Sequence, residues 1–170
     1  MQMKFMHINF LIQKRGRIIV RKICCFAGHS KLYNADEIYS RLISSIENLI
    51  VNEGVTEFWV GNYGAFDRLS AKAVRELKAK YPGIRLVLII PYVTSLINEN
   101  RESYYKDYDE ILVADIPEST PHRLRIIKSN QYMVKSSQFL ICYAEYSWGG
   151  AAKTLEYAKK RKISIINIAL

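Results

Sequence analysis

Short apolar runs alternate with longer amphipathic stretches along most of the chain. The apolar runs are rich in β-branched and other aliphatic side chains, a pattern typical of strands buried in a sheet. These runs cover residues 18–26, 57–60, 84–90, 110–113, 139–143 and 163–168. In the stretches between them, apolar residues recur every three or four positions, which is the spacing of one helix face. These stretches predict helices over residues 35–52, 68–80, 94–105, 121–135 and 151–160.

Strands that alternate with helices of this length form βαβ units, in which successive strands run parallel. We therefore predict an α/β fold, a Rossmann-like three-layer sandwich with a mainly parallel sheet. The 170 residues fit one such domain. We place this domain at residues 22–170 and treat residues 1–21 as a basic leader or extension.

The net charge of +9 comes largely from the start of the chain. Residues 1–22 hold six of the 25 Lys and Arg residues and none of the 16 acidic residues, so the remainder has 19 basic residues against 16 acidic ones. A basic arm can bind an anionic partner or stay solvated, and it can also add an edge strand. Because His7 and Asn9 interrupt its apolar stretch and no small-residue cleavage site follows, we expect no secretory signal. The chain has no run of about 18 apolar residues, so we expect no membrane span.

The three cysteines are Cys24, Cys25 and Cys142, an odd number without the spacing of a metal site. Neighbours on a strand point to opposite faces, so we expect Cys24 and Cys25 on opposite sides of the sheet. We expect three buried free thiols and a cytoplasmic, reducing environment.

Glycines and polar residues gather where the predicted strands end. In a parallel sheet, ligands bind beyond the carboxyl ends of the strands, where loops lead into helices. A glycine lets the backbone approach a phosphate, and the N-terminus of the next helix offers free N–H groups. The candidates are Gly28 and His29 after the first strand, Gly61 and Gly64 after the second, and Gly149, Gly150 and Thr154 after the late strand. The alternative for each loop is a tight turn without a ligand.

Five segments of the chain resemble the motifs of one known group of proteins. They are Cys25 to His29, Gly61 to Asp67, the pair Tyr81-Pro82 with Pro91-Tyr92, Asn130 to Val134, and Gly149 to Thr154. In order and spacing they resemble the YpsA-like family of the SLOG superfamily, the Rossmannoid group that includes the DNA-processing protein DprA (Smf) and the LOG phosphoribohydrolases. The resemblance runs from about Lys22 to the end of the chain.

This resemblance implies a Rossmann-like fold and a pocket for a nucleotide or an ADP-ribose-like molecule. The chain departs from the family pattern at three positions, where Ser30 and Ser129 replace arginines and Asn62 replaces a loop glycine. Arginine binds phosphate through two parallel hydrogen bonds, which serine cannot do. The candidate substitutes are Arg68, Arg123, Arg125 and Lys153.

Several side chains remain as candidates for individual roles. Asp67 can cap the free N–H groups of a helix or bind a ribose hydroxyl. His29 can contact a ligand, act in acid–base chemistry or simply fix its loop. Tyr92 and Trp148 lie at strand ends and are candidates for stacking on a base, while we expect the other tyrosines, Tyr146 among them, to cover the core.

We therefore expect a nucleotide-type small molecule as the partner, bound at the carboxyl end of the sheet in a sensor or signalling module. The first alternative is a nucleotide phosphoribohydrolase or N-glycosidase, which the LOG resemblance would assign to Glu156; the alternative for Glu156 is a solvated helix residue. The second alternative is a DprA-like nucleic-acid-binding module that uses the basic leader. The sequence predicts no metal site and no resident cofactor, and a homo-oligomer stays open.

Overall fold

Six parallel strands form the central sheet of this protein. The structure is a computed structural model that describes residues 11–14 and 17–169. The strands are β3 (Ile23–Gly28), β4 (Glu57–Val60), β5 (Arg85–Ile90), β6 (Glu110–Val113), β7 (Phe139–Tyr143) and β8 (Ser164–Asn167). Their order across the sheet is β6-β5-β4-β3-β7-β8, and every neighbouring pair is parallel. The predicted fold class is confirmed.

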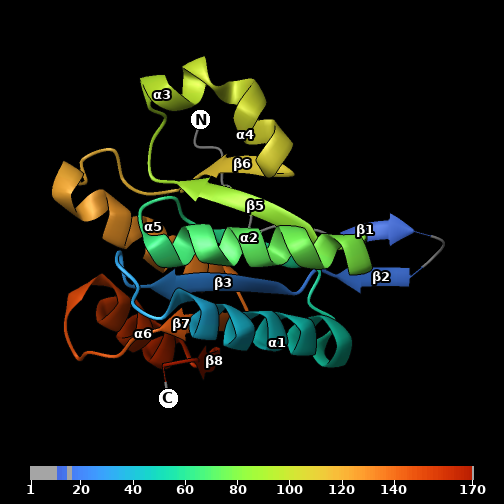
Figure 1. Cartoon of the computed structure of the whole chain (residues 1–170). Helices are drawn as coiled ribbons and strands as arrows, with labels where there is room; N and C mark the ends of the chain where they lie inside the picture. Colours follow the sequence, from blue (N-terminus) through green and yellow to red (C-terminus); the bar gives the residue numbers. More distant parts are fainter. Residues whose placement is uncertain (1–10, 15–16, 170) are drawn as a thin grey trace.

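Helices cover both faces of the sheet. On the near face in Figure 1 lie α1 (Ala35–Glu53) and α2 (Ala65–Lys80), and on the far face lie α5 (His122–Ser136) and α6 (Gly149–Arg161). Two short helices, α3 (Ser95–Glu99) and α4 (Arg101–Asp107), connect β5 to β6. The arrangement is the three-layer sandwich that alternating strands and helices predict.

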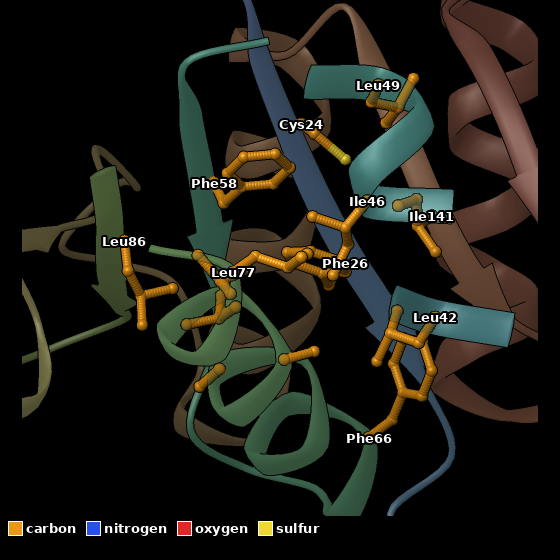
Figure 2. Close-up of a cluster of buried hydrophobic side chains, with 14 of the residues drawn as sticks. Cys24, Phe26, Leu42, Ile46, Leu49, Phe58, Phe66, Leu77, Leu86 and Ile141 are labelled. Atoms are coloured by element: carbon orange, nitrogen blue, oxygen red, sulfur yellow. The ribbon is translucent and has the colours of Figure 1, made fainter. Parts of the chain in front are cut away.

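The strands contribute alternate side chains to two separate cores, because successive residues of a strand point to opposite faces. Cys24 and Phe26 of β3 join the core under α1 and α2, whereas Cys25 and Ala27 join the core under α5 and α6. Figure 2 shows the first of these cores, in which Phe66 and Leu77 of α2 pack with residues of α1 and the sheet. Burial on both faces explains why these strands are almost continuously apolar.

The first predicted strand, 18–26, is two strands in the structure. Residues Arg17–Val20 form β2, which pairs antiparallel with β1 (Leu11–Lys14), and β3 starts only at Ile23. Arg21 and Lys22 separate the two strands. The Arg21 guanidinium binds the buried Glu57 carboxylate at 3.1 Å, and the Lys22 carbonyl accepts the N–H groups of Thr56 and Glu57. The leader predicted over residues 1–21 lies partly outside the described residues, at 1–10 and 15–16.

Some other element boundaries differ from prediction, where the local signal is weak. The helix predicted over 94–105 is divided at Asn100 into α3 and α4. Helix α2 begins three residues earlier than predicted and α6 two residues earlier, so Gly149 and Gly150 lie in the first turn of α6. Glycine disfavours a helix interior, but Gly149 stands at the helix start with φ = 91°, a conformation that favours glycine.

The connections of the sheet change direction between β3 and β7. From β3 the chain moves through β4 and β5 to β6, and it then returns to β7 and β8 on the other side. Helix α1, which follows β3, and helix α6, which follows β7, cover opposite faces. A crevice for ligands forms at such a switch point in open α/β sheets. Among the described residues, no helix has the length and apolar character that crossing a membrane requires.

Candidate functional site

The sequence-predicted glycine turns lie at one edge of the sheet. Strands β4, β3 and β7 are adjacent and parallel, so the loops that follow them leave from the same, carboxyl edge. His29 follows β3, Gly61 to Gly64 follow β4, and Tyr146 to Gly150 follow β7. The two glycine turns, β4–α2 and β7–α6, flank the loop after β3.

The β4–α2 turn directs its N–H groups into the protein. The first N–H groups of α2, those of Ala65 and Phe66, donate to the carbonyls of Ser30 and His29 at 3.0 and 3.3 Å. The N–H of Tyr63 donates to Oδ2 of Asp67 at 3.0 Å. These groups therefore hold the β3–α1 loop in place.

Close packing explains the glycines of this region. A Cβ atom on Gly28 would lie 2.3 Å from Cγ of Phe66, and one on Gly64 would lie 3.1 Å from the Cα atom of Ser30. At Gly61, a Cβ atom would lie 3.0 Å from Oδ2 of Asp67. The close neighbour is a side chain at Gly28 and Gly61 and backbone at Gly64, so an added methyl group would require that neighbour to shift.

Asp67 belongs to this packed turn. Burial raises the pKa of its carboxyl, while the N–H groups of Tyr63 and Gly64 and the charge of Arg68 act in the opposite direction. The carboxyl satisfies loop N–H groups, as a residue near a helix start often does. Ribose binding by Asp67 stays a prediction.

The β7–α6 turn is open by comparison. Helix α6 follows Trp148 without a side-chain cap, and in the described part of the chain no loop carbonyl accepts the first N–H groups of this helix. Gly149 has φ = 91°, a left-handed conformation that strongly favours glycine. A Cβ atom on Gly150 would meet nothing within 4 Å. The Thr154 hydroxyl, by contrast, is used within the helix, where it donates to the Gly150 carbonyl at 2.9 Å.

Four rings line up beside this turn, and we call them the aromatic row: Tyr143, His29, Tyr146 and Trp148. Tyr146 and Trp148 stack with their centroids 5.3 Å apart, and the His29 ring contacts both Tyr146 and Tyr143. Trp148 is 70% exposed and Tyr146 is 48% exposed. The prediction that Tyr146 covers the core is therefore wrong, because Tyr146 continues the row outward from the buried Tyr143. Its signal in the sequence was its place two residues before Trp148 after a buried strand.

His29 links the two sides of the switch point. Its Nε2 atom accepts a hydrogen bond from the N–H of Glu145, 3.1 Å away, and so joins the loop after β3 to the loop after β7. This bond requires Nε2 to be unprotonated. His29 thus fixes its loop in the structure, one of the roles that its position suggests.

Two predicted candidates lie away from this turn. Tyr92 follows β5, where its ring contacts His122 and the Arg125 guanidinium. Glu156 is exposed on α6 and pairs with Lys159 at 2.8 Å, and its hydrogen bond to Lys159 lowers the pKa of the carboxyl. A general acid needs the opposite shift. The catalytic role of Glu156 stays a prediction.

The candidate substitutes for the missing arginines are dispersed. Arg125 donates to the carbonyls of Thr120 and Glu118, and Arg123 and Lys153 are exposed. Arg68 lines a cleft of about 450 Å³ between α2 and α4. A second cavity, of about 470 Å³, lies between α1 and β8. Neither lining includes Trp148, Gly149 or Gly150, although Asn167 of the second cavity hydrogen-bonds Ala144, directly after β7.

The cysteines are buried, as predicted, and form no disulfide. Burial raises the pKa of the Cys25 and Cys142 thiols to about 12, so neither is a thiolate at neutral pH. In residues 11–14 and 17–169, no cluster of three or more His, Cys, Asp and Glu side chains is arranged to hold a metal ion.

Two solved structures share the fold of this chain. One is DNA processing protein A (DprA) from Streptococcus pneumoniae, with a TM-score of 0.61 and 16% identity over 85% of this chain. The other is DNA processing protein A from Helicobacter pylori, whose description names a single-stranded DNA binding mode, with a TM-score of 0.59 and 12% identity over the same share. This chain spans only 49% and 63% of those two chains.

Sequence comparison gives the family. The chain is 26% identical over 141 residues to the uncharacterized SPbeta prophage-derived protein YoqJ of Bacillus subtilis (strain 168). The alignment covers 73% of this chain and 81% of that protein. The sequence model of YpsA, described as the YspA SLOG family, matches residues 25–168. That match includes every strand of the parallel sheet except the first two residues of β3. With the Rossmann-like sheet and its glycine turns in place, the chain belongs to the YpsA family of SLOG proteins.

Proposed function

We propose that this protein binds a nucleotide or an ADP-ribose-like ligand at the β7–α6 turn. One observation carries the proposal: helix α6 begins without a side-chain cap, directly beside an exposed stacked pair of aromatic rings. Helix N-termini attract anions because their N–H groups are free and their dipole is positive. Exposed aromatic rings attract planar bases.

The parts of such a ligand match the parts of the turn. A phosphate group meets the N–H groups of Gly149 and Gly150, which the open space above Gly150 lets it approach. A base stacks on Trp148, whose ring is already oriented by Tyr146. The switch point between β3 and β7 is where α/β sheets of this design receive their ligands.

Calorimetric titration tests the proposal with ADP-ribose, NAD, AMP and cyclic nucleotides. We expect at least one of them to bind with a Kd below the millimolar range. Absence of binding by all of them at millimolar concentration would overturn the proposal.

A tryptophan substitution locates the site. Stacking of a base on an aromatic ring contributes about 1–3 kcal/mol, so we expect Trp148→Ala to weaken binding about tenfold. Tyr105→Ala, which removes another exposed ring from α4, is the matched control and should leave the Kd unchanged. Equal affinity of Trp148→Ala and the unmodified chain would place the ligand elsewhere.

A single-stranded nucleic acid is the second candidate. It is favoured by the exposed Tyr146–Trp148 pair, because strands bind through stacked bases, and by the fold shared with a DprA whose description names single-stranded DNA. It predicts an affinity that falls steeply with salt and is lost when residues 1–21 are removed. We rank it second because only the start of the chain is strongly basic.

A further inference from the structure

The cleft between α2 and α4 lies on a different flank of the sheet from the β7–α6 turn. It has a volume of about 450 Å³. Arg68, Ala71 and Arg75 line one wall, and they share one face of α2 because they are three and four residues apart. Helix α4 and the residue that follows it form the other wall, with Ser103, Tyr104, Asp107 and Tyr108. The remaining lining residues are Asn62 and Asn100.

The two arginines of the cleft differ in their partners from several basic residues nearby. Lys78, Lys80 and Arg85 each pair with a carboxylate. Within the described ranges, neither Arg68 nor Arg75 forms an ion pair with an acidic side chain. The described lining holds two guanidinium groups against one carboxylate, that of Asp107, so its formal charge is positive. Guanidinium groups bind phosphate through paired, charge-assisted hydrogen bonds.

The opposite wall is aromatic. The rings of Tyr104 and Tyr108 stack with their centroids 6.4 Å apart, and the Arg75 guanidinium lies 5.9 Å from the centroid of the Tyr108 ring. The side-chain amide of Asn62 donates to the Tyr104 hydroxyl at 3.4 Å. The cleft thus offers cations on one side and π-faces on the other.

We propose that this cleft is a second site, which binds a nucleoside phosphate. The phosphate pairs with Arg68 and Arg75, and the base packs against the tyrosine wall. Asp107, the one carboxylate among the described residues of the lining, accepts a hydrogen bond from a sugar hydroxyl. The nucleoside phosphate is either a free nucleotide or a unit of a single strand, since both present the same groups to the cleft.

The inference is independent of the β7–α6 turn. The cleft is built on the α2 side of the sheet, next to β4, whereas the proposed function uses the start of α6 beside β7. The two sites can therefore succeed or fail separately.

NMR titration of the full chain, with backbone amide signals followed residue by residue, tests this site. The probes are AMP, inorganic phosphate and a short oligothymidylate. We expect AMP to shift signals of α2 and α4, and inorganic phosphate to shift signals near Arg68 and Arg75 more weakly. A tighter response to the oligonucleotide than to AMP would assign the cleft to a strand, and a tighter response to AMP would assign it to a free nucleotide.

Substitutions on one helix provide matched controls. Charge-assisted hydrogen bonds typically contribute about 1.5–3 kcal/mol, so Arg68→Gln and Arg75→Gln should each weaken binding in the cleft about tenfold or more. Lys72→Gln removes the same charge from α2, but Lys72 faces Tyr39 of α1 and should have little effect. Thermal unfolding of each variant checks that the fold is retained.

Three outcomes would overturn the inference. The first is that none of the probes shifts signals of α2 or α4. The second is that Lys72→Gln weakens binding as much as Arg68→Gln, which would mark a non-specific effect of charge. The third is that AMP shifts only signals around α6, which would support the proposed function and remove this second site.

Discussion

The two glycine turns of this protein have similar sequences and different structural roles. Both follow a buried strand, both begin a helix, and both leave the carboxyl edge of the same sheet. In the β4–α2 turn, the N–H groups of Tyr63, Ala65 and Phe66 all have acceptors inside the protein. In the β7–α6 turn, the helix start is uncapped and open space lies above Gly150.

The difference shows what a glycine before a helix can mean. In one turn glycine permits backbone segments to pack against each other, and in the other it gives a loop its left-handed conformation and leaves N–H groups accessible. In the sequence, the two turns show the same pattern, with glycines between a buried strand and a helix. The two kinds of turn differ in whether their backbone N–H groups have hydrogen-bond acceptors inside the protein.

The largest effect should come from Gly28→Ala. The new Cβ atom would lie 2.3 Å from the Phe66 ring, so we expect a loss of about 3 kcal/mol in the free energy of unfolding, at the upper end of ordinary overpacking. Gly83→Ala, which meets nothing within 4 Å, is the matched control. Urea unfolding measures both. If the clash is with the ring, Gly28→Ala should cost less in a Phe66→Ala background, which removes the two nearest atoms, Cγ and Cδ1; an unchanged cost would locate the strain elsewhere.

Substitution of Asp67 should have the next largest effect on folding stability, and this effect should depend on pH. Asp67→Ala leaves the Tyr63 N–H without its acceptor, at a cost of about 1–2 kcal/mol, while Asp67→Asn keeps an acceptor and costs less. Burial raises the pKa of the carboxyl above its ordinary 3.8, so the folded state binds the proton more tightly than the unfolded chain. The favourable contribution of Asp67 is therefore complete below pH 3.8 and is lost as pH rises through the raised pKa.

Urea unfolding over a series of pH values measures this dependence. The unmodified chain should lose stability relative to Asp67→Asn as pH rises from below 3.8. A difference between the two chains that grows in the opposite direction would contradict the assignment of a raised pKa.

Gly150→Ala should have a smaller effect on stability, of opposite sign. Alanine favours a helix over glycine by about 0.5–1 kcal/mol, and its Cβ atom meets no neighbour, so we expect a slight stabilisation. The same methyl group would project into the space that the proposed phosphate needs, so nucleotide affinity should fall. Thermal unfolding and calorimetric titration measure the two effects. Unchanged affinity would indicate that the ligand does not approach Gly150.

Glu156→Ala should have the smallest effect. The side chain is exposed and pairs with Lys159 across one helical turn, so we expect no measurable change in the unfolding midpoint. Lys159→Gln, which breaks the same pair from the other side, is the matched control. A chromatographic assay for free base released from AMP tests the catalytic alternative. Release by the unmodified chain that disappears in Glu156→Ala would support a phosphoribohydrolase in place of a binding protein.

Much of the fold follows from local pattern. The strands predicted over 57–60, 110–113 and 139–143 have those bounds in the structure, because each is a short apolar run with a clear polar boundary. The division of the first strand could not be predicted in this way. It depends on Arg21 and Lys22, whose partners are Glu57, Thr56 and Glu53, more than 30 residues away.

The candidate site was predictable in its residues and only partly in its arrangement. Trp148, Gly149 and Gly150 could be named from the sequence, because they follow a buried strand and precede a helix. The exposure of Tyr146 could not, since it depends on ring contacts with His29 and Trp148 across two loops. The sequence likewise did not predict that the Thr154 hydroxyl donates to the Gly150 carbonyl of its own helix.

The sequence alone determined that parallel strands alternate with helices, and hence that glycine turns meet at one edge of a sheet, because periodicity and chain direction are local properties. The tertiary structure decided which of those turns is closed. That outcome depends on the carbonyls of His29 and Ser30, which reach the start of α2 but not the start of α6. A hydrogen bond between segments distant in the chain has no local signature, and it is these bonds that separate the packed turn from the open one.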